Sequence, residues 1–420
     1  MELLEKILEK ENLNKAYKQV KGNKGCAGID GIKTEEIDEY IKENKTLILT
    51  RIRKRKYQPS PVLRKQIPKA NGKKRNLGIP TVMDRIIQQA IVQVLSPIYE
   101  EQFHDNSFGF RPGRCCEQAV IKILEYLNDG YDWIVDIDLE RFFDTVNQDK
   151  LINIIRRTIE DGDVVSLIAK YLKCGVLEDG LVKPTNEGTP QGGNLSPLLS
   201  NIMLNELDKE LAKRNLNFTR YADDCVILVK SEKAANRVME SITKFIEKKL
   251  GLKVNMEKTK VTRPGQTKYL GFSFYKVGAK YYPKPHIKSI QSLKDKIRKR
   301  TIRKDNKLLD IRLKELKELI VGWVNYYKIA NMKSQMQEID RMIRRRIRVI
   351  ILKQWKKPKT IIKNLQRLGI DKEQAKGLAW CGKGLQYMAK SCVVQRAISN
   401  ERLMKRGLTS MLVQYQKVHI

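Results

Sequence analysis

The sequence RYADDCVILV, residues 220–229, sets two adjacent carboxylates, Asp223 and Asp224, directly before an apolar run. The run from Cys225 to Val229 is aliphatic and partly β-branched, which predicts a short buried strand. Two like charges beside a buried strand repel each other, and this costs free energy unless a cation offsets it. Because an isolated Asp-Asp pair is more often the solvated tip of a hairpin, a cation site here requires further acidic residues nearby.

A second apolar run supplies those acidic residues. WIVDIDLERFF, residues 133–143, carries Asp136 and Asp138 at positions two apart, which share one face of a strand. If Asp138 lies alongside Asp223 and Asp224, three carboxylates meet at one point. Mg²⁺ prefers oxygen ligands, and two such ions about 3.5–4 Å apart support in-line phosphoryl transfer. The two runs together therefore favour phosphoryl-transfer chemistry of the polymerase type.

The composition indicates a polyanionic partner. The chain has 420 residues, and 83 Lys and Arg against 48 Asp and Glu give a formal net charge of +35. An excess of this size concerns partners rather than fold, and the commonest partner is nucleic acid. The charge alone fits a membrane surface or a ribosome equally well. A basic chain that also holds a carboxylate cluster is what a nucleic-acid polymerase requires.

The sequence gives no sign of a membrane, secretion or zinc. No apolar run reaches the about 18–20 residues that span a bilayer, and the acidic, amphipathic start MELLEKILEKENL is unlike a signal peptide. The seven cysteines form no C-x-x-C pair and no zinc spacing, and the three histidines form no cluster. We therefore expect reduced thiols, no zinc, no membrane partner and a cytoplasmic location.

The pattern of apolar and charged residues along the chain changes near residue 280. Up to about residue 275, helical and strand-like patterns alternate, whereas after Pro285 the pattern is helical and basic. Pro358 marks a further boundary, after which the sequence is helical, small and basic. One helical seam has apolar residues alternating four and three apart, namely Leu309, Leu313, Leu316, Ile320, Trp323 and Tyr327.

The order and wording of the short motifs resemble a reverse transcriptase, specifically the group II intron-encoded reverse transcriptase/maturase family. Tyr221-Ala222-Asp223-Asp224 is similar to the family's YADD box, and VDIDLERFFDTV, residues 135–146, is similar to its first acidic motif. The resemblance runs through most of the chain. The other matching segments are VKGNKGCAGIDG (20–31), IPKANGKKRNLGIP (67–80), SFGFRPGRCCEQAV (107–120), GTPQGGNLSPLLSNIML (188–204), GLKVNMEKTKV (251–261), KYLGFSFY (268–275) and GWVNYYKIANM (322–332).

The resemblance implies an α+β fold: a right-hand polymerase with fingers and palm, a helical thumb or maturase domain, and a small helical appendage. The implied division is 1–60 for an amino-terminal extension of the fingers, 61–280 for fingers and palm, 285–355 for the thumb, and 359–420 for a small basic segment like a DNA-binding one. The implied activity is RNA-directed DNA polymerisation that copies intron RNA, with binding of that RNA to assist splicing and mobility, including retrohoming.

The resemblance assigns Asp138, Asp223 and Asp224 to two Mg²⁺ ions and to catalysis. Asp136 competes with Asp138 for this role. In the family an aromatic gate lies five residues after the metal aspartate, and Phe143 lies five after Asp138. Phe143 would crowd a ribose 2′-hydroxyl and so favour dNTPs. Core packing is an alternative role for Phe143, and the two roles are compatible.

Three further residues resemble those that bind the incoming nucleotide. Lys69 and Arg75 fall on a predicted hairpin with an Asn-Gly turn at residues 71–72, and would clamp the triphosphate. The neighbouring Lys73 and Lys74 are expected to be solvated turn charges. Gln191 would lie under the nascent base pair, although an ordinary loop is the alternative there.

The remaining implied roles fall later in the chain. Lys258 resembles the general acid that protonates the leaving pyrophosphate, with Lys260 as the alternative. Tyr269, Leu270 and Gly271 resemble the grip on the primer end, for which a plain hairpin is the alternative. The basic helices would contact RNA phosphates, with Lys294, Arg298, Arg344 and Arg345 as the named candidates.

The expected partners are group II intron RNA, an RNA template with a DNA primer, target DNA and dNTPs; a homodimer is left open. Many relatives carry a carboxy-terminal nuclease with Cys pairs and histidines, which residues up to Ile420 lack, so we expect no second-strand cleavage. Two other readings stay open: a reverse transcriptase that has left its intron for repair or defence, and an RNA-binding maturase without catalysis. The intact carboxylate set argues against the last.

Overall fold

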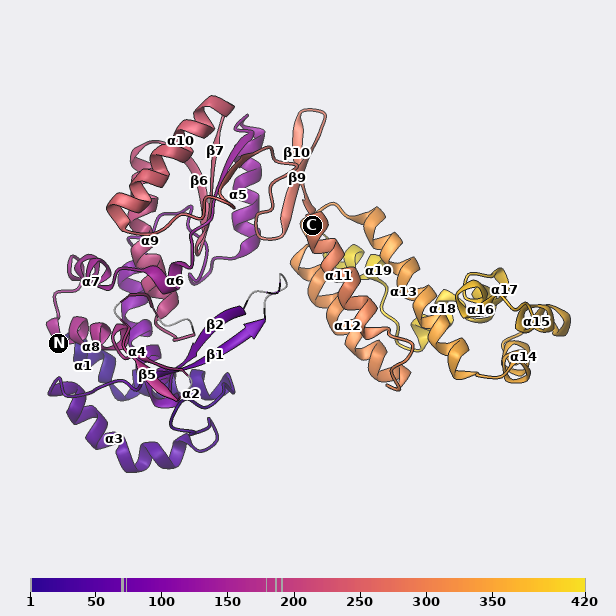
Figure 1. Cartoon of the computed structure of the whole chain (residues 1–420), viewed down its shortest axis with the longest axis horizontal. Coiled ribbons are helices and arrows are strands. Elements are labelled where there is room, and N and C mark those ends of the chain that lie inside the picture. Colours follow the sequence, from indigo (N-terminus) through magenta and orange to yellow (C-terminus); the bar gives the residue numbers. More distant parts are fainter. Residues whose placement is uncertain are drawn as a thin grey trace. The chain divides into compact units, whose positions relative to one another are not determined.

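The structure is a computed structural model that describes residues 2–68, 72, 74–178, 180–185, 187–189 and 192–419. Its contacts divide the chain into two compact units, Met1–Pro264 and Gly265–Ile420, called unit 1 and unit 2 below (Figure 1). Unit 1 combines helices with two sheets, whereas unit 2 is helical apart from one hairpin. This mixed content of helices and antiparallel sheet is the α+β class that the sequence predicts.

A four-stranded antiparallel sheet forms one half of unit 1. Its strands run in the order β6 (Asn217–Tyr221), β7 (Asp224–Val229), β3 (Trp133–Ile137) and β8 (Lys260–Thr262). The interior of β7 is fully buried, as its aliphatic sequence predicts. Three helices pack on the sheet, namely α5 (Cys116–Asn128), α9 (Ser196–Lys213) and α10 (Glu232–Phe245), which continues as η1 (Ile246–Leu250).

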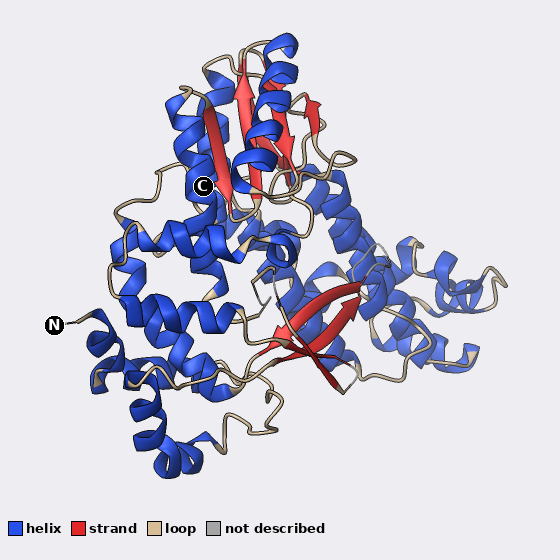
Figure 2. Ribbon diagram, turned by 60° about the vertical axis from the view of Figure 1, so that its left-hand side comes forward, coloured by secondary structure: helices blue, strands red, loops and turns tan. Residues whose placement is uncertain are grey.

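A second sheet in unit 1 contains the predicted hairpin at residues 67–80. Strands β1 (Val62–Pro68) and β2 (Lys74–Ile79) pair antiparallel, and β1 also pairs in parallel with β4 (Val176–Glu178), which pairs with β5 (Leu181–Lys183). Figure 2 shows this hairpin and the four-stranded sheet as separate groups of strands. The β1 strand is buried at Val62 and exposed from Lys65 onward, so the hairpin extends outward from the core.

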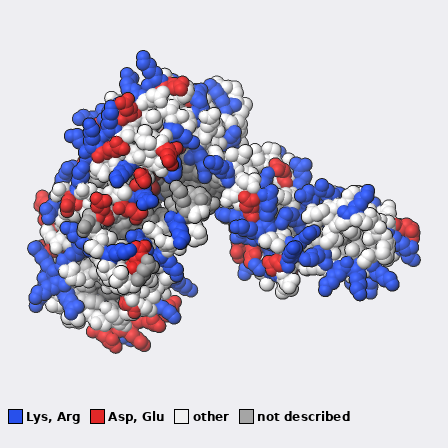
Figure 3. All heavy atoms as spheres, in the orientation of Figure 1, with Lys and Arg blue, Asp and Glu red and all other residues white. Residues whose placement is uncertain are grey.

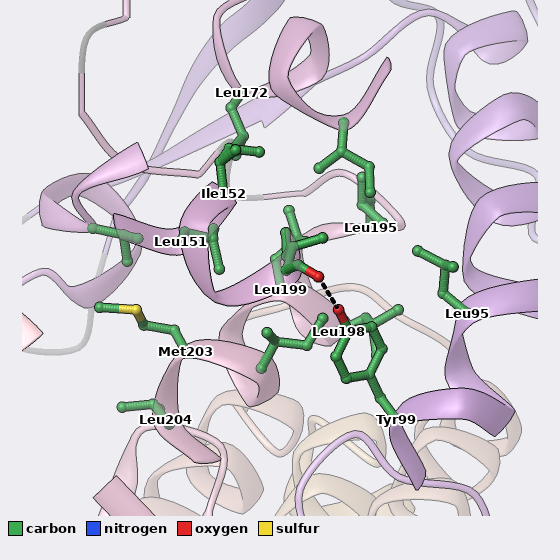
Figure 4. Packing of buried hydrophobic residues seen from close by; sticks show 14 of the residues in the cluster. Leu95, Tyr99, Leu151, Ile152, Leu172, Leu195, Leu198, Leu199, Met203 and Leu204 are labelled. Atoms are coloured by element: carbon green, nitrogen blue, oxygen red, sulfur yellow. Dashed lines mark hydrogen bonds between the residues drawn. The ribbon is translucent and has the colours of Figure 1, made fainter. Parts of the chain in front are cut away.

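The helices of unit 1 build one continuous apolar core. Figure 4 shows a part of it, where side chains from α4, α7, α8 and α9 meet Leu195, which directly precedes α9. Tyr99 lies there among leucines and donates a hydrogen bond of 3.4 Å to the backbone oxygen of Ile155. The helices that contribute, besides those above, are α1 (Leu3–Leu8), α2 (Lys10–Gly22), α3 (Ile37–Arg53), α4 (Val82–Glu100), α6 (Phe142–Thr145), α7 (Gln148–Arg156) and α8 (Gly162–Leu172).

Unit 2 begins with the hairpin β9 (Phe272–Val277) and β10 (Lys280–Pro285), followed by α11 (Ile287–Arg300), α12 (Leu309–Tyr326) and α13 (Lys333–Gln354). The predicted apolar seam on α12 is present: five of its six residues are buried, and the ring of Trp323 packs against that of Tyr327 in a tilted arrangement, with 4.4 Å between the ring centroids. Five shorter helices follow, namely α14 (Pro358–Arg367), α15 (Lys372–Ala379), α16 (Gly384–Met388), α17 (Cys392–Ala397) and α18 (Asn400–Lys405).

The helix α19 (Met411–Val418) returns to pack against both α12 and α13. Its first turn is capped by Asp340 on α13, whose carboxylate accepts hydrogen bonds from the backbone N–H groups of Met411 and Leu412 at 2.8 and 3.1 Å. Residues that follow the short helices therefore complete the core of unit 2.

The surface and the thiols agree with the composition. Figure 3 shows Lys and Arg spread widely over the visible face of both units, with acidic residues among them. All seven cysteines are free thiols. Within the described ranges, no helix combines the length and the apolar character needed to cross a bilayer.

Candidate active site

The turn between β6 and β7 carries the Asp-Asp pair. Tyr221 pairs with Asp224, so Ala222 and Asp223 form a two-residue hairpin turn. Ala222 has φ of +57°, a left-handed conformation that residues other than glycine rarely adopt. The surrounding structure must therefore hold this turn in place. The turn conformation then fixes the backbone positions of Asp223 and Asp224.

The neighbouring strand β3 brings Asp138 to the same end of the sheet. Ile137 at the end of β3 pairs with Cys225, which places the next residue, Asp138, beside Asp224. The backbone of Asp138 is fixed by the segment after η1: its N–H donates to Thr259 Oγ1 at 3.1 Å, and its carbonyl accepts from Asn255 at 2.8 Å. The sequence-predicted trio is thus assembled from two adjacent strand ends.

The electrostatics show how closely these acids interact. Loss of water, followed by repulsion from Asp223, Asp136 and Asp138, raises the pKa of Asp224 to about 6. Loss of water also raises the pKa of Asp136 to about 6, and repulsion from Asp138 adds to the rise. Four carboxylates therefore share one field, and a positive charge that entered it would be strongly favoured.

Two lysines already approach this field. Lys258 Nζ lies 2.9 Å from Asp138 Oδ2, and its charge partly offsets the raised pKa of Asp224. Lys260 on β8 pairs with Asp136 instead and lowers the pKa of that carboxyl. The geometry thus separates the two lysines between which the sequence left the choice open, with Lys258 on the side of Asp138.

The donor set fits a hard divalent cation. All donors are carboxylate oxygens, repulsion between them adds to the effect of burial on the pKa values of Asp224 and Asp136, and the ammonium of Lys258 lies beside Asp138. Among the residues that the structure describes, no three His, Cys, Asp or Glu side chains are close enough together to hold a metal as they stand. A metal would therefore require Lys258 to leave Asp138 and the carboxylates to turn toward each other.

Phe143 lies in the short helix α6, half-buried, with its ring 5.3 Å from that of the fully buried Phe142 in an edge-to-face arrangement. Its carbonyl oxygen accepts a hydrogen bond of 2.6 Å from Thr189, at the start of the GTPQGG segment. This contact brings that segment next to the predicted gate. Both roles proposed for Phe143 remain compatible with its position, since the side chain is partly packed and partly accessible.

The nucleotide-binding candidates are described only in part. Lys69 and Gln191 lie outside the described residues. Arg75 lies on β2 opposite Ile67, and only its backbone is described. Gly192, next to Gln191, approaches β2 so closely that an added Cβ would lie 2.5 Å from the carbonyl oxygen of Gly78. The GTPQGG segment and the hairpin are therefore adjacent in unit 1.

The primer-grip candidates Tyr269, Leu270 and Gly271 form a tight turn in unit 2. Tyr269 and Phe272 exchange backbone hydrogen bonds of 3.0 and 2.8 Å around it. Tyr326 on α12 donates its hydroxyl to the carbonyl of Leu270 at 2.8 Å. This turn therefore belongs to unit 2. The resemblance had instead assigned residues up to 280 to the fingers and palm.

The RNA-binding candidates lie on two helices of unit 2. Lys294 and Arg298 on α11 already form ion pairs, with Glu338 and Asp295 respectively, both at 2.7 Å. Arg344 and Arg345 lie half-buried on α13. Exposed ion pairs of this kind contribute little stability and exchange readily, so they leave a phosphate free to compete for the two α11 residues.

Sequence reasoning missed a buried polar network directly behind the Asp223–Asp224 turn. Arg220 is fully buried and binds Asp208 on α9 through two hydrogen bonds of 2.8 and 2.5 Å. It also contacts Asn201 and the carbonyl oxygen of Ala222. One signal was available: Arg220 is two residues from the buried Phe218 in β6 and so faces the core, where a charge requires a partner.

Comparisons with known proteins place this geometry in a family. Residues 67–274 match the family described as reverse transcriptase (RNA-dependent DNA polymerase), and residues 290–369 match the maturase-specific domain of group II introns. Protein YkfC of Escherichia coli is 35% identical over 299 residues, which is 62% of this chain and 78% of that protein. The group II intron-encoded protein LtrA of Lactococcus lactis is 34% identical over 323 residues, or 61% of this chain, and the chain spans about half (54%) of LtrA.

A solved structure of telomerase from Candida albicans covers 90% of this chain, with a TM-score of 0.45 and 14% identity, which is too weak a likeness to bear on function. The two family matches instead follow one another along the chain in the order of the motifs, polymerase first and maturase domain second. Members of the reverse transcriptase family use divalent metal ions, in keeping with the carboxylate field at β3 and β7. The chain belongs to the group II intron-encoded reverse transcriptases/maturases, and its enzymatic class is RNA-directed DNA polymerase.

Proposed function

We propose that the chain copies group II intron RNA into DNA from a DNA primer, using dNTPs and two Mg²⁺ ions held by Asp138, Asp223 and Asp224. The observation that carries this proposal is the strand pairing that brings Asp138, just past the end of β3, beside Asp224 at the start of β7 and next to Asp223 in the turn. Carboxylates brought together in this way repel one another, and a divalent cation between them offsets that repulsion.

The proposed ions would activate the primer 3′-hydroxyl and stabilise the leaving oxygen of the triphosphate. The residues of the chain do the remaining work. The turn at Ala222 and the end of β3 present the three aspartates from fixed backbone positions. Lys258 is held within 2.9 Å of Asp138, from where a released ammonium can donate a proton to pyrophosphate.

The substrate contacts in this proposal follow the resemblance. Lys69 and Arg75 bind the triphosphate, Gln191 lies under the new base pair, and Phe143 excludes a ribose 2′-hydroxyl. Tyr269, Leu270 and Gly271 hold the primer end. The hydrogen bond between the Thr189 backbone and Phe143 supports one part of this scheme, because it brings the GTPQGG segment next to the proposed gate.

The domain roles are likewise proposed. Residues 1–60 extend the fingers, 61–280 form fingers and palm, 285–355 form the thumb or maturase domain, and 359–420 contact target DNA. Intron RNA binds the basic helices through Lys294, Arg298, Arg344 and Arg345, which supports splicing and mobility. The high positive charge of the chain, +35, supports phosphate contacts of this kind.

Primer extension on an RNA template with dNTPs and Mg²⁺ tests the enzyme. Asp223→Asn removes one carboxylate, and the loss of several kcal/mol of charge stabilisation lowers the rate on the order of 1000-fold. Asp129→Asn, an exposed carboxylate after α5, is the matched control and keeps the wild-type rate. Extension with rNTPs is absent for the wild type and appears for Phe143→Ala if the gate is correctly assigned.

The alternative readings have distinct outcomes. A folded wild-type chain that binds intron RNA tightly but extends no primer would identify an RNA-binding maturase without catalysis. A chain that extends primers on every template and shows no preference for intron RNA over unrelated RNA would favour an enzyme used in repair or defence.

A further inference from the structure

The buried guanidinium of Arg220 joins the catalytic turn to the body of unit 1. Its Nε and Nη2 donate to the two carboxylate oxygens of Asp208, which neutralise its charge in a bidentate pair. Its remaining nitrogen, Nη1, donates to Asn201 Oδ1 at 3.0 Å and to the carbonyl oxygen of Ala222 at 2.9 Å. All three partners are buried. The planar fork therefore links helix α9 rigidly to the peptide that precedes Asp223.

That peptide needs a restraint. Ala222 has φ of +57°, which an alanine rarely adopts without support from its surroundings. The carbonyl of Ala222 belongs to the peptide group that joins it to Asp223. A hydrogen bond to this oxygen consequently fixes the direction in which the chain enters Asp223.

Gly109 packs against the side of the turn opposite Arg220. Gly109 approaches so closely that an added Cβ would lie 2.2 Å from the backbone nitrogen of Ala222, so only glycine fits. Asn201 connects Gly109 with Arg220, since its Nδ2 donates to the carbonyl of Gly109 at 2.8 Å while its Oδ1 accepts from Arg220. The backbone of Arg220 also exchanges hydrogen bonds of 2.9 Å with Asn106 and Phe108.

We propose that Arg220, Asn201 and Gly109 are positioning residues that set the Asp223–Asp224 turn relative to Asp138 and thereby determine metal affinity and turnover. This inference rests on the proposed function of the three aspartates. The argument is geometric: a buried ion pair is a weak source of net stability, yet here Nη1 of the same guanidinium also donates to the backbone of the Asp223–Asp224 turn. None of the three residues touches substrate in this scheme.

The test compares two asparagines on the same helix. Asn201 and Asn205 are both buried on α9, and each donates its side-chain amide to a backbone carbonyl, that of Gly109 at 2.8 Å and that of Gln102 at 3.1 Å. Of the two, only Asn201 contacts Gly109 and Arg220, the residues that hold the turn. Asn205→Ala is therefore a matched control for Asn201→Ala, because both remove a buried amide of the same kind.

Two readouts are measured on the full chain: turnover in primer extension at saturating dNTP, and the affinity for Mn²⁺ determined by electron paramagnetic resonance without nucleotide. For Asn201→Ala and Arg220→Lys, we expect turnover to fall about 10- to 100-fold, since small misplacements of catalytic groups have effects of this order. We expect their Mn²⁺ affinity to weaken severalfold. Arg220→Lys keeps the charge opposite Asp208 but loses the fork. Asn205→Ala should lower the melting temperature as Asn201→Ala does while leaving both readouts near wild type.

Gly109→Ala disturbs the turn from the side opposite Arg220. The folded fraction of this variant should show the same loss of Mn²⁺ affinity. The inference is overturned if Asn201→Ala and Asn205→Ala behave alike in both readouts while Asp223→Asn abolishes extension. If instead wild type and Asp223→Asn are equally inactive and bind Mn²⁺ equally, the proposed function itself fails. The two failures are therefore distinguishable.

Discussion

Two arginines, one in each unit, are almost completely withdrawn from water, yet they use their charge in opposite ways. Arg220 is 0% exposed and Arg312 is 1% exposed. Arg220 is paired with the buried carboxylate of Asp208 and has one nitrogen left for the catalytic turn. Arg312 donates to three backbone carbonyls, those of Arg300, Asp305 and Lys307, at 2.6–3.0 Å.

The setting of Arg312 explains its partners. Arg300 ends α11, where backbone carbonyls lack partners within the helix and the helix dipole favours a cation. Arg312 therefore fastens the loop after α11 to the start of α12. The nearest carboxylate, that of Asp305, lies 3.6 Å away and is about half exposed. A buried charge thus does not by itself indicate a functional site. The role proposed for Arg220 rests instead on its hydrogen bond to the carbonyl oxygen of Ala222.

The largest expected effect comes from breaking the pair in unit 1. Asp208→Asn leaves the guanidinium of Arg220 buried without its counter-charge, which costs about 3–5 kcal/mol of the free energy of unfolding. Differential scanning calorimetry should show a much lower melting temperature for the transition of unit 1. An unchanged transition would mean that Arg220 does not depend on Asp208, and the contrast between the two arginines would disappear.

A smaller effect is expected in unit 2. Arg312→Leu removes three hydrogen bonds from a buried guanidinium to backbone carbonyls and should lower the free energy of unfolding of unit 2 by about 1–3 kcal/mol. Turnover per folded molecule at saturating primer and template should stay within about threefold of wild type. This is less than the tenfold change that about 1.4 kcal/mol of activation free energy would cause. Active-site titration supplies the folded fraction. A specific loss of turnover would give Arg312 a role like that of Arg220.

The third expectation concerns pH. The ordinary pKa of the Asp224 carboxyl is 3.8 and its folded pKa is about 6, so the folded state binds the proton more tightly than the unfolded state. Stability should therefore fall as the pH rises from about 4 to 6 and remain lower above 6. Asp224→Asn should be more stable than wild type at pH 8 without metal, on the order of 1 kcal/mol once solvent screening is included.

The measurement is the melting temperature of both proteins in EDTA across that pH range. The advantage of Asp224→Asn should vanish near pH 4. Added Mg²⁺ should raise the melting temperature of the wild type more than that of the variant, because a ligand of the folded state stabilises it. An advantage that grows toward low pH would contradict the shared field of the four carboxylates.

The smallest effect is expected for the counterpart of Asp208 in unit 2. Asp305→Asn removes a distant, half-exposed partner of Arg312 and should change the free energy of unfolding by about 0.5 kcal/mol or less. Urea denaturation of this variant beside Asp208→Asn gives the sharpest form of the comparison. A loss of several kcal/mol would show that Arg312 also relies on a carboxylate.

Local patterns sufficed for part of this architecture. The aliphatic run after Asp224 predicts β7, and the spacing of leucines predicts the seam of α12, because each pattern lies within one element. The five-residue spacing to Phe143 favoured Asp138, and the structure places Asp138 just past the end of β3, beside Asp224. Asp136 was held only as a competitor, yet it is part of the same electrostatic field.

The rest depends on partners that are distant in sequence. Lys258 and Asp138 are 120 residues apart, and Asn201 meets Gly109 from 92 residues away. No spacing rule connects such pairs, since the fold alone brings their elements together. The hydrophobic position of Arg220 in β6 signals a buried charge, but it does not say which carboxylate neutralises it or which backbone oxygen receives its last donor.

The return of α19 to α12 and α13 has a consequence for the order in which the protein matures on the ribosome. The contacts of unit 1 are complete once residue 264 has been made, so this unit can fold while synthesis continues. The helices of unit 2 must wait for residues 411–418, since α19 packs against both α12 and α13 and its first turn is capped by Asp340. A nascent chain stalled between these points would carry a folded unit 1 and an unfinished unit 2.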